Sequence, residues 1–545
     1  MPFDSTFPPL DIPEDVDLWS LLFAGNQRPF PANKKILTCP ETHGSYTWSD
    51  LREASINFGR GLQEQYAWKK GDVLAFYTPN SIDTPILTLG ALYAGAIVSP
   101  SNPLYTPEEL AFQLRDSSAK ALVTQPAYLP TAIAAAKKAS LSLSRIILLG
   151  SQDASDFPHF ASIHPSPSSP PQPVLSISPK VDPAFLVYSS GTTGLPKGVI
   201  LTHYNMVANI LQASATEGSQ WSWSVDKQLA FLPFFHIYGL TCCVLLSIYS
   251  GWETIVLERF DLAKCLSAIA THRITFLYCP PPVILAFSKS PLVSSYDLSS
   301  LKVLHSGAAP LTKELTLAVW DRLKIPVKQG FGLSETSAVV CCQMVPEWKE
   351  FMGSVGQLMP NMQAKLVDPS TGKEETQEGE LWLKGPNVFR GYYKNEQKTK
   401  EAFSRDGYFM TGDVFRRDGH GNFYCVDRLK ELIKYNGYPV PPAELEGILV
   451  GHKDVADACV VGIEDKALAT EAPRAYVVLR EGVTANPAKA QELVDLIASK
   501  VAPHKKLRGG IRFVDSVPKS PSGKVLRRLM RDQAKAEERA AGSKL

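Results

Sequence analysis

Short apolar runs alternate with amphipathic helical patterns over the first two thirds of the chain. The run DVLAFYTPNS predicts a strand followed by a turn, and IDTPILTLGALYAGA after it has the spacing of a helix. Further buried strands are predicted at KALVTQ, RIILLG, AFLVYSS, ITFLYCP, LKVLHSG and IPVKQG, and most of them precede a turn and a helix. This alternation predicts an α/β fold with largely parallel sheets flanked by helices, in which a ligand lies beyond the carboxyl ends of the strands.

Local sequence signals predict a helix start and an exposed connector within this pattern. Thr106 has the features of a helix N-cap, with Pro107 at the first helical position and Glu109 completing a capping box. The Pro/Ser-rich stretch 162–183 is expected to be an exposed connector.

The pattern changes near residue 428. DACVVGI and PRAYVVL predict paired strands, NPAKAQELVDLIASKV predicts a helix, and GKVLRRLMRDQAKAEERA predicts a basic terminal helix. We therefore expect a smaller α+β domain after the large α/β domain.

Composition excludes several classes of partner. The net charge of +2 is too small to create a field that attracts nucleic acid or an acidic membrane. The basic runs HKKLRGGIR and KVLRRLMR are interpreted as solvated or substrate-facing charge. No nucleic-acid partner is therefore expected. Apolar runs such as CCVLLSIY are too short for a membrane span. Nine cysteines, an odd number with no CxxC, predict reduced thiols that mostly fill the core.

A targeting signal is predicted at the C-terminus and none at the N-terminus. The acidic, Pro-rich start lacks the features of a signal peptide. Ser543-Lys544-Leu545 has the form of a peroxisomal address, which predicts recognition by the peroxisomal import receptor; the alternative is a chance tripeptide after a charged helix.

The stretch YSSGTTGLPKGV, residues 188–199, predicts a phosphate-binding loop at the end of a buried strand. Glycines allow backbone N–H groups to crowd around phosphate oxygens, and Lys197 adds a cation. Hydroxyl donors come from Ser189, Ser190, Thr192 and Thr193. The loop lacks the GxxxxGK[ST] pattern of P-loop NTPases, because Pro196 precedes the lysine and no Ser or Thr follows it. The alternative is a solvent-exposed Gly/Ser linker.

This loop resembles the signature of the adenylate-forming enzymes, which include acyl-CoA synthetases, peptide-synthetase adenylation domains and beetle luciferases. Seven more stretches follow in family order and spacing: LPFFHIYGL, HSGAAPL, QGFGLSE, GELWLKGPNVFRGYY, DGYFMTGD, DRLKELIKYNGYPVPPAELE and PKSPSGKVLRR. FFHIYGL and SGAAPL are most similar to the 4-coumarate–CoA ligase-like group. The resemblance implies a large domain over 1–427, a hinge at 428–430 and a small mobile domain over 431–545.

The resemblance implies an acid–CoA ligase that uses ATP, Mg²⁺ and coenzyme A. A carboxylic acid would attack the α-phosphate of MgATP to give an acyl-adenylate and pyrophosphate, and coenzyme A would then displace AMP. The implied nucleotide-binding residues are Ser189, Ser190, Gly191, Thr192, Thr193, Gly194, Lys197, Ala309, Gln329, Gly330, Phe331, Ser334, Asp413, Arg428, Lys430 and Lys524.

Individual roles follow from the same resemblance and fit the chemistry of the side chains. Glu335 would hold Mg²⁺, which favours one or two carboxylates together with phosphate oxygens. Asp413 would accept from the ribose hydroxyls, with Arg428 beside it. Lys524 would catalyse adenylation when the small domain docks, because its ammonium can neutralise both the carboxylate and the α-phosphate; Thr193 of the loop is also implied in catalysis.

A second face of the small domain would form the thioester. Lys434, Asn436 and Gly437 are implied there, and Arg259 of the large domain matches a position that meets coenzyme A in relatives, although it can equally be a surface arginine. Two residues depart from the family pattern: Asn436 replaces a frequent lysine, and Pro439 replaces a glutamine that contacts the nucleotide phosphate in coumarate ligases.

The resemblance places the acid near LPFFHIYGL and HSGAAPL. His236 would lie at the mouth of the acid pocket as a catalytic side chain, and Tyr238 along its wall; both can also be ordinary core residues. Small or apolar wall positions are implied at Gly307, Ala308, Gly332 and Cys342. We see no acidic group to pair with an α-ammonium, which argues against amino acids. An aryl acid of the cinnamic or phenylacetic type and a medium-chain acid both remain open.

Two other functions remain as alternatives. One is a luciferase-like adenylating monooxygenase, and the other is a non-catalytic nucleotide-binding protein on the same fold. The presence of Lys197, Glu335, Asp413, Arg428 and Lys524 argues against the second.

Overall fold

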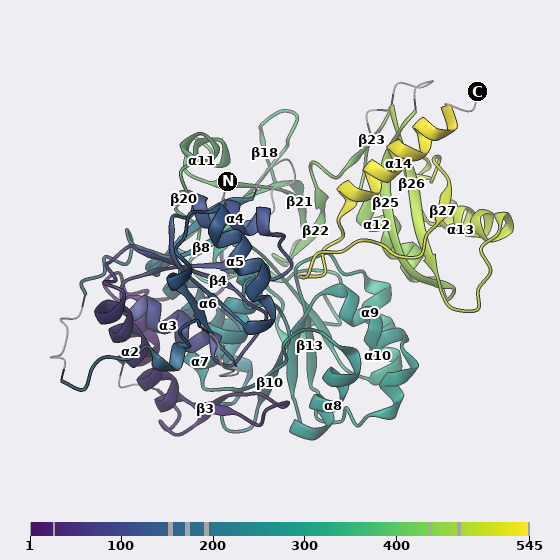
Figure 1. Cartoon of the computed structure of the whole chain (residues 1–545). Coiled ribbons are helices and arrows are strands. Elements are labelled where there is room, and N and C mark those ends of the chain that lie inside the picture. Colours follow the sequence, from purple (N-terminus) through teal and green to yellow (C-terminus); the bar gives the residue numbers. More distant parts are fainter. Residues whose placement is uncertain are drawn as a thin grey trace.

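The computed structural model describes residues 2–25, 28–150, 156–168, 175–189, 196–436, 438–465 and 470–542. Its large N-terminal part contains three sheets with helices packed around them, and the C-terminal part after residue 430 lies to one side (Figure 1). We call these parts the large domain and the small domain.

A seven-stranded sheet contains the two strands that flank the candidate phosphate loop. Its strand order is β20-β9-β8-β5-β4-β6-β7, and β4 to β8 run parallel to one another. The strands are β4 (Val73–Tyr77), β5 (Ile97–Ser101), β6 (Ala119–Thr124), β7 (Ile146–Leu148), β8 (Pro183–Ser189), β9 (Lys197–Thr202) and β20 (Gly391–Tyr392). All five residues of β4 are buried, as expected for a parallel strand covered on both faces.

A nine-stranded sheet carries the other predicted strands in the order β16-β15-β14-β13-β12-β10-β11-β2-β3. Its strands are β2 (Lys35–Thr38), β3 (Ser45–Thr47), β10 (Lys227–Ala230), β11 (Glu253–Val256), β12 (Phe276–Cys279), β13 (Val303–Ser306), β14 (Val327–Leu333), β15 (Ala338–Cys342) and β16 (Gln357–Leu358). The six strands from β14 to β2 are parallel, and antiparallel strands extend both edges. The predicted α/β class with parallel sheets is confirmed.

A third sheet is antiparallel and was not predicted. It contains β1 (Phe3–Asp4), β17 (Gln363–Val367), β18 (Glu374–Glu375), β19 (Glu378–Lys384), β21 (Phe409–Arg417) and β22 (Phe423–Arg428). Burial alternates along β19, and this period-two pattern in EGELWLK is the sequence signal that predicts such a strand.

Fourteen helices surround the sheets of the described ranges. They are α1 (Leu18–Phe23), α2 (Trp48–Gln65), α3 (Thr84–Tyr93), α4 (Pro107–Asp116), α5 (Leu129–Lys138), α6 (His203–Thr216), α7 (Leu246–Ser250), α8 (Leu262–His272), α9 (Pro281–Lys289), α10 (Lys313–Leu323), α11 (Glu396–Ala402), α12 (Pro442–Val450), α13 (Pro487–Lys500) and α14 (Arg527–Gly542). The capping box at Thr106 is confirmed, because its side chain accepts from Glu109 N while Glu109 accepts from Thr106 N.

The terminal helix starts later than predicted. Residues 519–526 form a turn in which Ser520 N donates to Lys524 O at 2.8 Å, and α14 begins at Arg527. Lys524 therefore lies on a loop ahead of the helix.

The small domain has its own apolar core. The predicted strand pair is confirmed as β25 (Val455–Asp465) and β26 (Thr470–Leu479), which are antiparallel, and β27 (Ile511–Phe513) joins β26 in parallel. A hairpin is formed by β23 (Ile433–Tyr435) and β24 (Tyr438–Val440). A cluster that includes Leu445, Val460, Val477 and Leu493 is separate from the core of the large domain. The exact domain boundaries and the hinge at 428–430 stay predictions.

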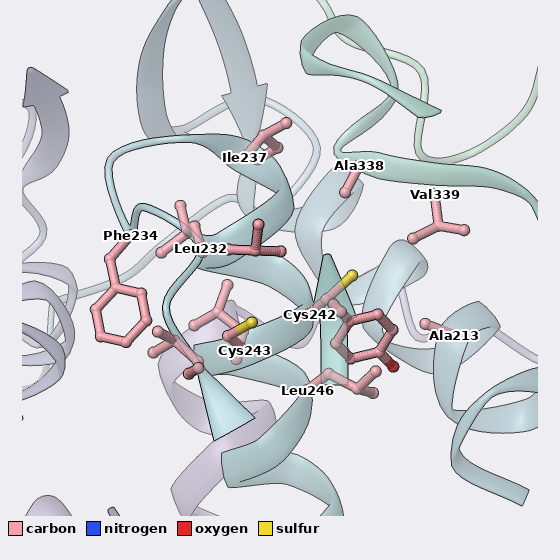
Figure 2. Close-up of a cluster of buried hydrophobic side chains, with 14 of the residues drawn as sticks. Ala213, Leu232, Phe234, Ile237, Cys242, Cys243, Leu246, Ala338 and Val339 are labelled. Carbon is pink, nitrogen blue, oxygen red and sulfur yellow. The ribbon is translucent and has the colours of Figure 1, made fainter. Parts of the chain in front are cut away.

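The interior of the large domain accounts for most of the cysteines. All nine are free, and seven are buried. Figure 2 shows Cys242 and Cys243 within an apolar cluster, on the π-helix that covers Gly239–Leu245 and leads into α7. Among the described helices, none combines the length and apolar character that a bilayer crossing requires.

Candidate active site

A cavity lies between the large and the small domain. Its wall from the large domain comes from the carboxyl ends of β13 and β14 and from β21 and β22. The loop before α14, one face of α12 and the start of β25 supply the wall from the small domain. Eight residues singled out in the sequence line it: Ala308, Ala309, Gly330, Phe331, Gly332, Asp413, Arg428 and Lys524. Parallel strands end at one edge of their sheet, which is why residues distant in sequence meet there.

Asp413 and Arg428 form an ion pair in this wall. They face each other across β21 and β22, and Asp413 Oδ1 lies 2.9 Å from Arg428 Nε. The second oxygen, Asp413 Oδ2, is buried and has no hydrogen-bond partner within the described part of the chain. Burial raises the pKa of Asp413, and the charge of Arg428 opposes that rise. A buried acceptor without a donor is costly, so this oxygen suits a ligand that brings hydroxyl groups.

Lys524 supplies a cation from the small domain. Its backbone N–H donates to Ser520 Oγ at 3.1 Å, which helps to hold the loop. Burial and the charge of Arg428 lower the pKa of Lys524 to about 8, while Glu431 opposes them. Four cations line the cavity. Three of them, Arg428, Lys519 and Arg527, form ion pairs with nearby carboxylates. Lys524 forms no ion pair within the described part of the chain, so its charge is the one best placed to attract an anionic ligand.

His236 is neutral at physiological pH. Burial and the charge of Lys524 lower the pKa of His236 to about 4. Its Nδ1 accepts a hydrogen bond from Tyr238 N at 3.3 Å. Because a neutral imidazole carries one proton, Nε2 holds it and can donate to a ligand.

Tyr238 packs where the sequence placed the acid pocket. Its hydroxyl donates to His305 O at 3.2 Å. A Cβ at Gly307 would lie 3.0 Å from the Tyr238 ring, so the small residue permits this close contact.

A second set of polar groups lies beside the phosphate loop. Lys197 begins β9, and its Nζ lies 4.7 Å from the centroid of the Tyr392 ring. The Tyr392 hydroxyl donates to Glu335 Oε1 at 2.9 Å. Burial lowers the pKa of Lys197, and the carboxylate of Glu335 opposes that shift. A carboxylate next to a lysine at the end of the loop is suited to a metal ion bound to phosphates.

The strands on either side of the loop, β8 and β9, pair in the antiparallel sense. Ser189 pairs with Lys197 in this pair of strands. The predicted residues Ser190, Gly191, Thr192, Thr193 and Gly194 lie outside the described residues. The following helix α6 begins only after β9, with Thr202 as its N-cap.

The strand β14 presents the candidate adenine-binding residues. Gln329 is buried, and its backbone N and O pair with Gln343. The Phe331 ring packs edge-to-face with the ring of Phe415, with 4.7 Å between the ring centroids, and Phe331 also lines the cavity. Ser334 lies at the start of the short helical turn that carries Glu335.

Cys342 lies in a buried ionic cluster instead of in the wall of the cavity. Glu217 Oε1 lies 2.7 Å from Cys342 Sγ, 2.5 Å from Lys328 Nζ and 3.2 Å from His305 Nδ1. Burial alone would raise the pKa of Glu217, but the charge of Lys328 and hydrogen bonds from its neighbours hold that pKa below its usual range. The His305 ring touches the cavity wall from behind, because a Cβ at Gly330 would lie 2.8 Å from His305 Nε2.

The remaining candidates face solvent in this arrangement of the domains. Arg259, Lys430, Lys434 and Asn436 are exposed, and Gly437 lies outside the described residues. Lys434 and Asn436 belong to the β23–β24 hairpin, where their backbone N–H groups donate to Glu471 and Thr470. The structure thus brings Lys524 to the cavity while Lys434 stays outside it.

Residues of the site that the sequence analysis missed are partners of the predicted ones. Tyr392 lies in the quoted motif GELWLKGPNVFRGYY, and its hydroxyl gave no local signal of a contact with Glu335. Arg527 lines the cavity behind Lys524 and forms ion pairs with Glu431 and Glu446. These contacts fix the charge around Lys524 and depend on the docking of elements far apart in the chain.

The arrangement is suited to bind an anion that also carries hydroxyl groups. Lys524 and Arg428 supply positive charge, and Asp413 supplies a free acceptor. His236 supplies a neutral N–H donor near Lys524. Cations and donors placed in advance can stabilise negative charge that develops during a group transfer.

Comparison with known proteins gives consistent matches over both domains. Residues 23–393 match the family model described as AMP-binding enzyme, and residues 444–524 match the AMP-binding enzyme C-terminal domain. A probable 4-coumarate–CoA ligase of Dictyostelium discoideum is 38% identical over 480 residues, which are 85% of this chain and 86% of the relative. A 4-coumarate–CoA ligase of Pinus taeda is 35% identical over 543 residues, 98% of each chain. The crystal structure of ATP-bound MatB from Rhodopseudomonas palustris has a TM-score of 0.82 and 26% identity, and the match covers 95% of this chain and 98% of that one.

Proposed function

The chain belongs to the AMP-binding enzyme family and is an acid–thiol ligase, and we propose that it joins an aryl carboxylic acid to coenzyme A through an acyl-adenylate. The observation that carries the proposal is the interdomain cavity, where Lys524 and Arg428 lie around the unpartnered oxygen of Asp413. The relatives named as 4-coumarate–CoA ligases support an aryl acid.

In the first half-reaction, a carboxylate oxygen of the acid bonds to the α-phosphorus of ATP. The bond from that phosphorus to the oxygen bridging the α- and β-phosphates breaks, and pyrophosphate leaves. Negative charge increases around the α-phosphorus. The ammonium of Lys524 offsets this charge and brings the two anions together, because a fixed cation in a partly buried site needs no reorganisation. The Nε2–H of His236 can orient the carboxylate.

Three groups hold the nucleotide in this proposal. Asp413 Oδ2 accepts from the ribose hydroxyls, which satisfies its buried lone pairs. Lys197 neutralises phosphate oxygens at the end of β9. Glu335 would hold Mg²⁺, and the bound ion would supply positive charge to neutralise the leaving pyrophosphate.

In the second half-reaction, the thiolate of coenzyme A bonds to the acyl carbon. The bond from that carbon to the AMP oxygen breaks, and AMP leaves. We propose that residues 428–430 act as a hinge that withdraws Lys524 and brings the exposed face with Lys434 and Asn436 toward the site. The solvent position of that face, while Lys524 lines the cavity, supports the proposal.

Pyrophosphate release tests the reaction and the acid together. The full chain is incubated with MgATP and coenzyme A and with cinnamic, phenylacetic, benzoic and C6–C12 fatty acids, with Lys524→Ala as the inactive control. We expect release that depends on the acid and is fastest with an aryl acid. A preference for fatty acids would replace the aryl acid by a medium-chain acid, and no acid-dependent release across the panel would refute the ligase.

Import into peroxisomes is a separate proposal that rests on the terminal Ser543-Lys544-Leu545. These residues lie outside the described part of the chain. A fluorescent protein fused ahead of the full chain should appear in peroxisomes, and deletion of the tripeptide should return it to the cytosol. An unchanged distribution after the deletion would refute the signal.

A further inference from the structure

Lys289 links the two domains beside the cavity, whose lining includes Val450. It is the last residue of α9 in the large domain. Its Nζ donates to three backbone carbonyls of the small domain, at 2.6 Å to Val450, 2.8 Å to Val455 and 3.5 Å to His452. An ammonium has three donors, so this one side chain can satisfy all three oxygens.

These carbonyls lie at the C-terminus of α12 and in the turn that follows it. Val450 ends α12, and Val455 begins β25. The last carbonyls of a helix have no partner inside the helix and carry partial negative charge. Lys289 therefore completes the end of a small-domain helix from outside that domain. Lys289 is partly buried, and burial together with the charge of Arg480 lowers the pKa of Lys289 to about 8.

The other end of α9 touches the loop that carries Lys524. A Cβ at Gly523 would lie 2.8 Å from Pro280 Cβ, directly before α9, so the two backbones are in close contact. At a spacing of 1.5 Å per residue, the nine residues of α9 span about 13 Å. One short helix thus contacts the small domain at two separated points.

A third contact comes from the neighbouring helix α10. Thr312 is the N-cap of α10, and a Cβ at Gly447 in the middle of α12 would lie 2.1 Å from Thr312 Cγ2. Glycine alone permits this approach. Figure 1 shows α9 and α10 on the side of the large domain that faces α12. Three separate contacts, at both ends of α9 and at the start of α10, together hold the small domain against the large domain.

We infer that Lys289 is a positioning residue for the adenylation step, because its contact with the end of α12 holds the small domain in the orientation that places Lys524 in the cavity. The inference rests on the proposed two-step function. In the proposed change of orientation, a rotation of the small domain about residues 428–430 that carries α12 away from α9 would separate Nζ from all three carbonyls. Lys289 therefore favours adenylation and opposes the change to the thioester-forming orientation.

The two half-reactions are measured separately in the full-length protein to test this. Lys289→Met keeps the length of the side chain and removes the charge and the donors. We expect pyrophosphate release in the presence of acid and MgATP to fall at least tenfold in kcat. Formation of acyl-CoA from a supplied acyl-adenylate should be unchanged or faster. Lys289→Arg should recover part of the lost adenylation, because a guanidinium also donates to carbonyls.

Two further variants separate docking from general damage. Lys264→Met removes an exposed lysine of α8 in the same domain and should leave both rates as in the wild type. Gly447→Ala disturbs the same docking surface without touching Lys289 and should show the same selective loss of adenylation. The distribution of distances between spin labels at the exposed positions Lys324 and Glu481 should be broader in Lys289→Met than in the wild type.

The outcomes distinguish this inference from the proposed function. A wild-type protein that releases no pyrophosphate with any acid refutes the ligase itself. An active wild type with normal adenylation by Lys289→Met overturns the role of Lys289. Equal loss of both half-reactions in Lys289→Met, with no recovery in Lys289→Arg, overturns it as well, because it indicates general destabilisation.

Discussion

The protonation of Lys524 should limit adenylation at alkaline pH. Burial and the charge of Arg428 lower the pKa of Lys524 to about 8, whereas an exposed lysine titrates near 10.4. The charged form is the one that offsets the developing charge at the α-phosphate, so rate should follow the protonated fraction. With a pKa of about 8, that fraction falls from about nine-tenths at pH 7 to about one-tenth at pH 9. We therefore expect kcat/KM for pyrophosphate release to fall about tenfold over this interval.

The matched substitution is Lys524→Arg. A guanidinium stays charged throughout this range, so the variant should be slower in absolute terms but should lose the decline between pH 7 and pH 9. The assay is kcat/KM for acid-dependent pyrophosphate release at constant ionic strength. Ionisation of the substrates is the same for both enzymes and cancels in the ratio of their rates.

One other cation has to be separated from Lys524. The pKa of Lys289 is also lowered to about 8, so its deprotonation could weaken docking over the same interval. Lys289→Met should keep the alkaline decline if Lys524 causes it. A decline of equal size in Lys524→Arg and the wild type would refute the assignment to Lys524.

Three more predictions follow from the side-chain contacts. Asp413→Asn replaces a charged hydrogen-bond acceptor by a neutral amide. The hydrogen bonds to ribose should weaken by about 1.5–3 kcal/mol, so the KM for ATP should rise at least tenfold, with a smaller effect on the KM for the acid. An unchanged KM for ATP would contradict the assignment of Asp413 to ribose. Tyr392→Phe removes the hydrogen bond to Glu335. In a magnesium titration, the Mg²⁺ concentration that gives half the maximal rate should shift several-fold. An unchanged concentration would mean that Tyr392 does not influence the metal site. Lys328→Met leaves the Glu217 carboxylate buried without its cation and should lower the free energy of unfolding by about 3–5 kcal/mol. The double variant Lys328→Met with Glu217→Gln should recover much of the lost thermal midpoint, measured at one scan rate. If the loss in the double variant equals the sum of the losses in the two single variants, the two side chains are not coupled.

The elements of the fold could be predicted from the sequence where local patterns decide. The buried runs that became β4, β6 and β8 are continuous apolar stretches, and the start of α4 at Thr106 follows from its own capping box. The antiparallel sheet around β19 and β21 was missed because its strands are half-exposed and carry many charged residues. The late start of α14 was missed because a helical pattern does not show where a turn such as 519–526 interrupts it.

The candidate site divides in the same way. The residue types at Asp413, Glu335 and Lys524 stood in motifs whose chemistry could be interpreted from the sequence and from the family resemblance. Their environments could not, because burial and partner charges arise only when the domains pack. The low pKa of His236 comes first from burial and then from the charge of Lys524, which lies in the other domain.

The sequence by itself determined the class of fold, the order of most strands and helices and the chemical groups available for an acid–thiol ligase, because hydrophobic period, caps and motifs act over a few residues. Only the tertiary structure decided which groups meet. Tyr392 reaches Glu335 across 57 residues, Lys328 reaches Glu217 across 111, and Lys289 reaches Val450 across 161. Such contacts form when separate elements pack on one another, and no local preference of the chain specifies their partners.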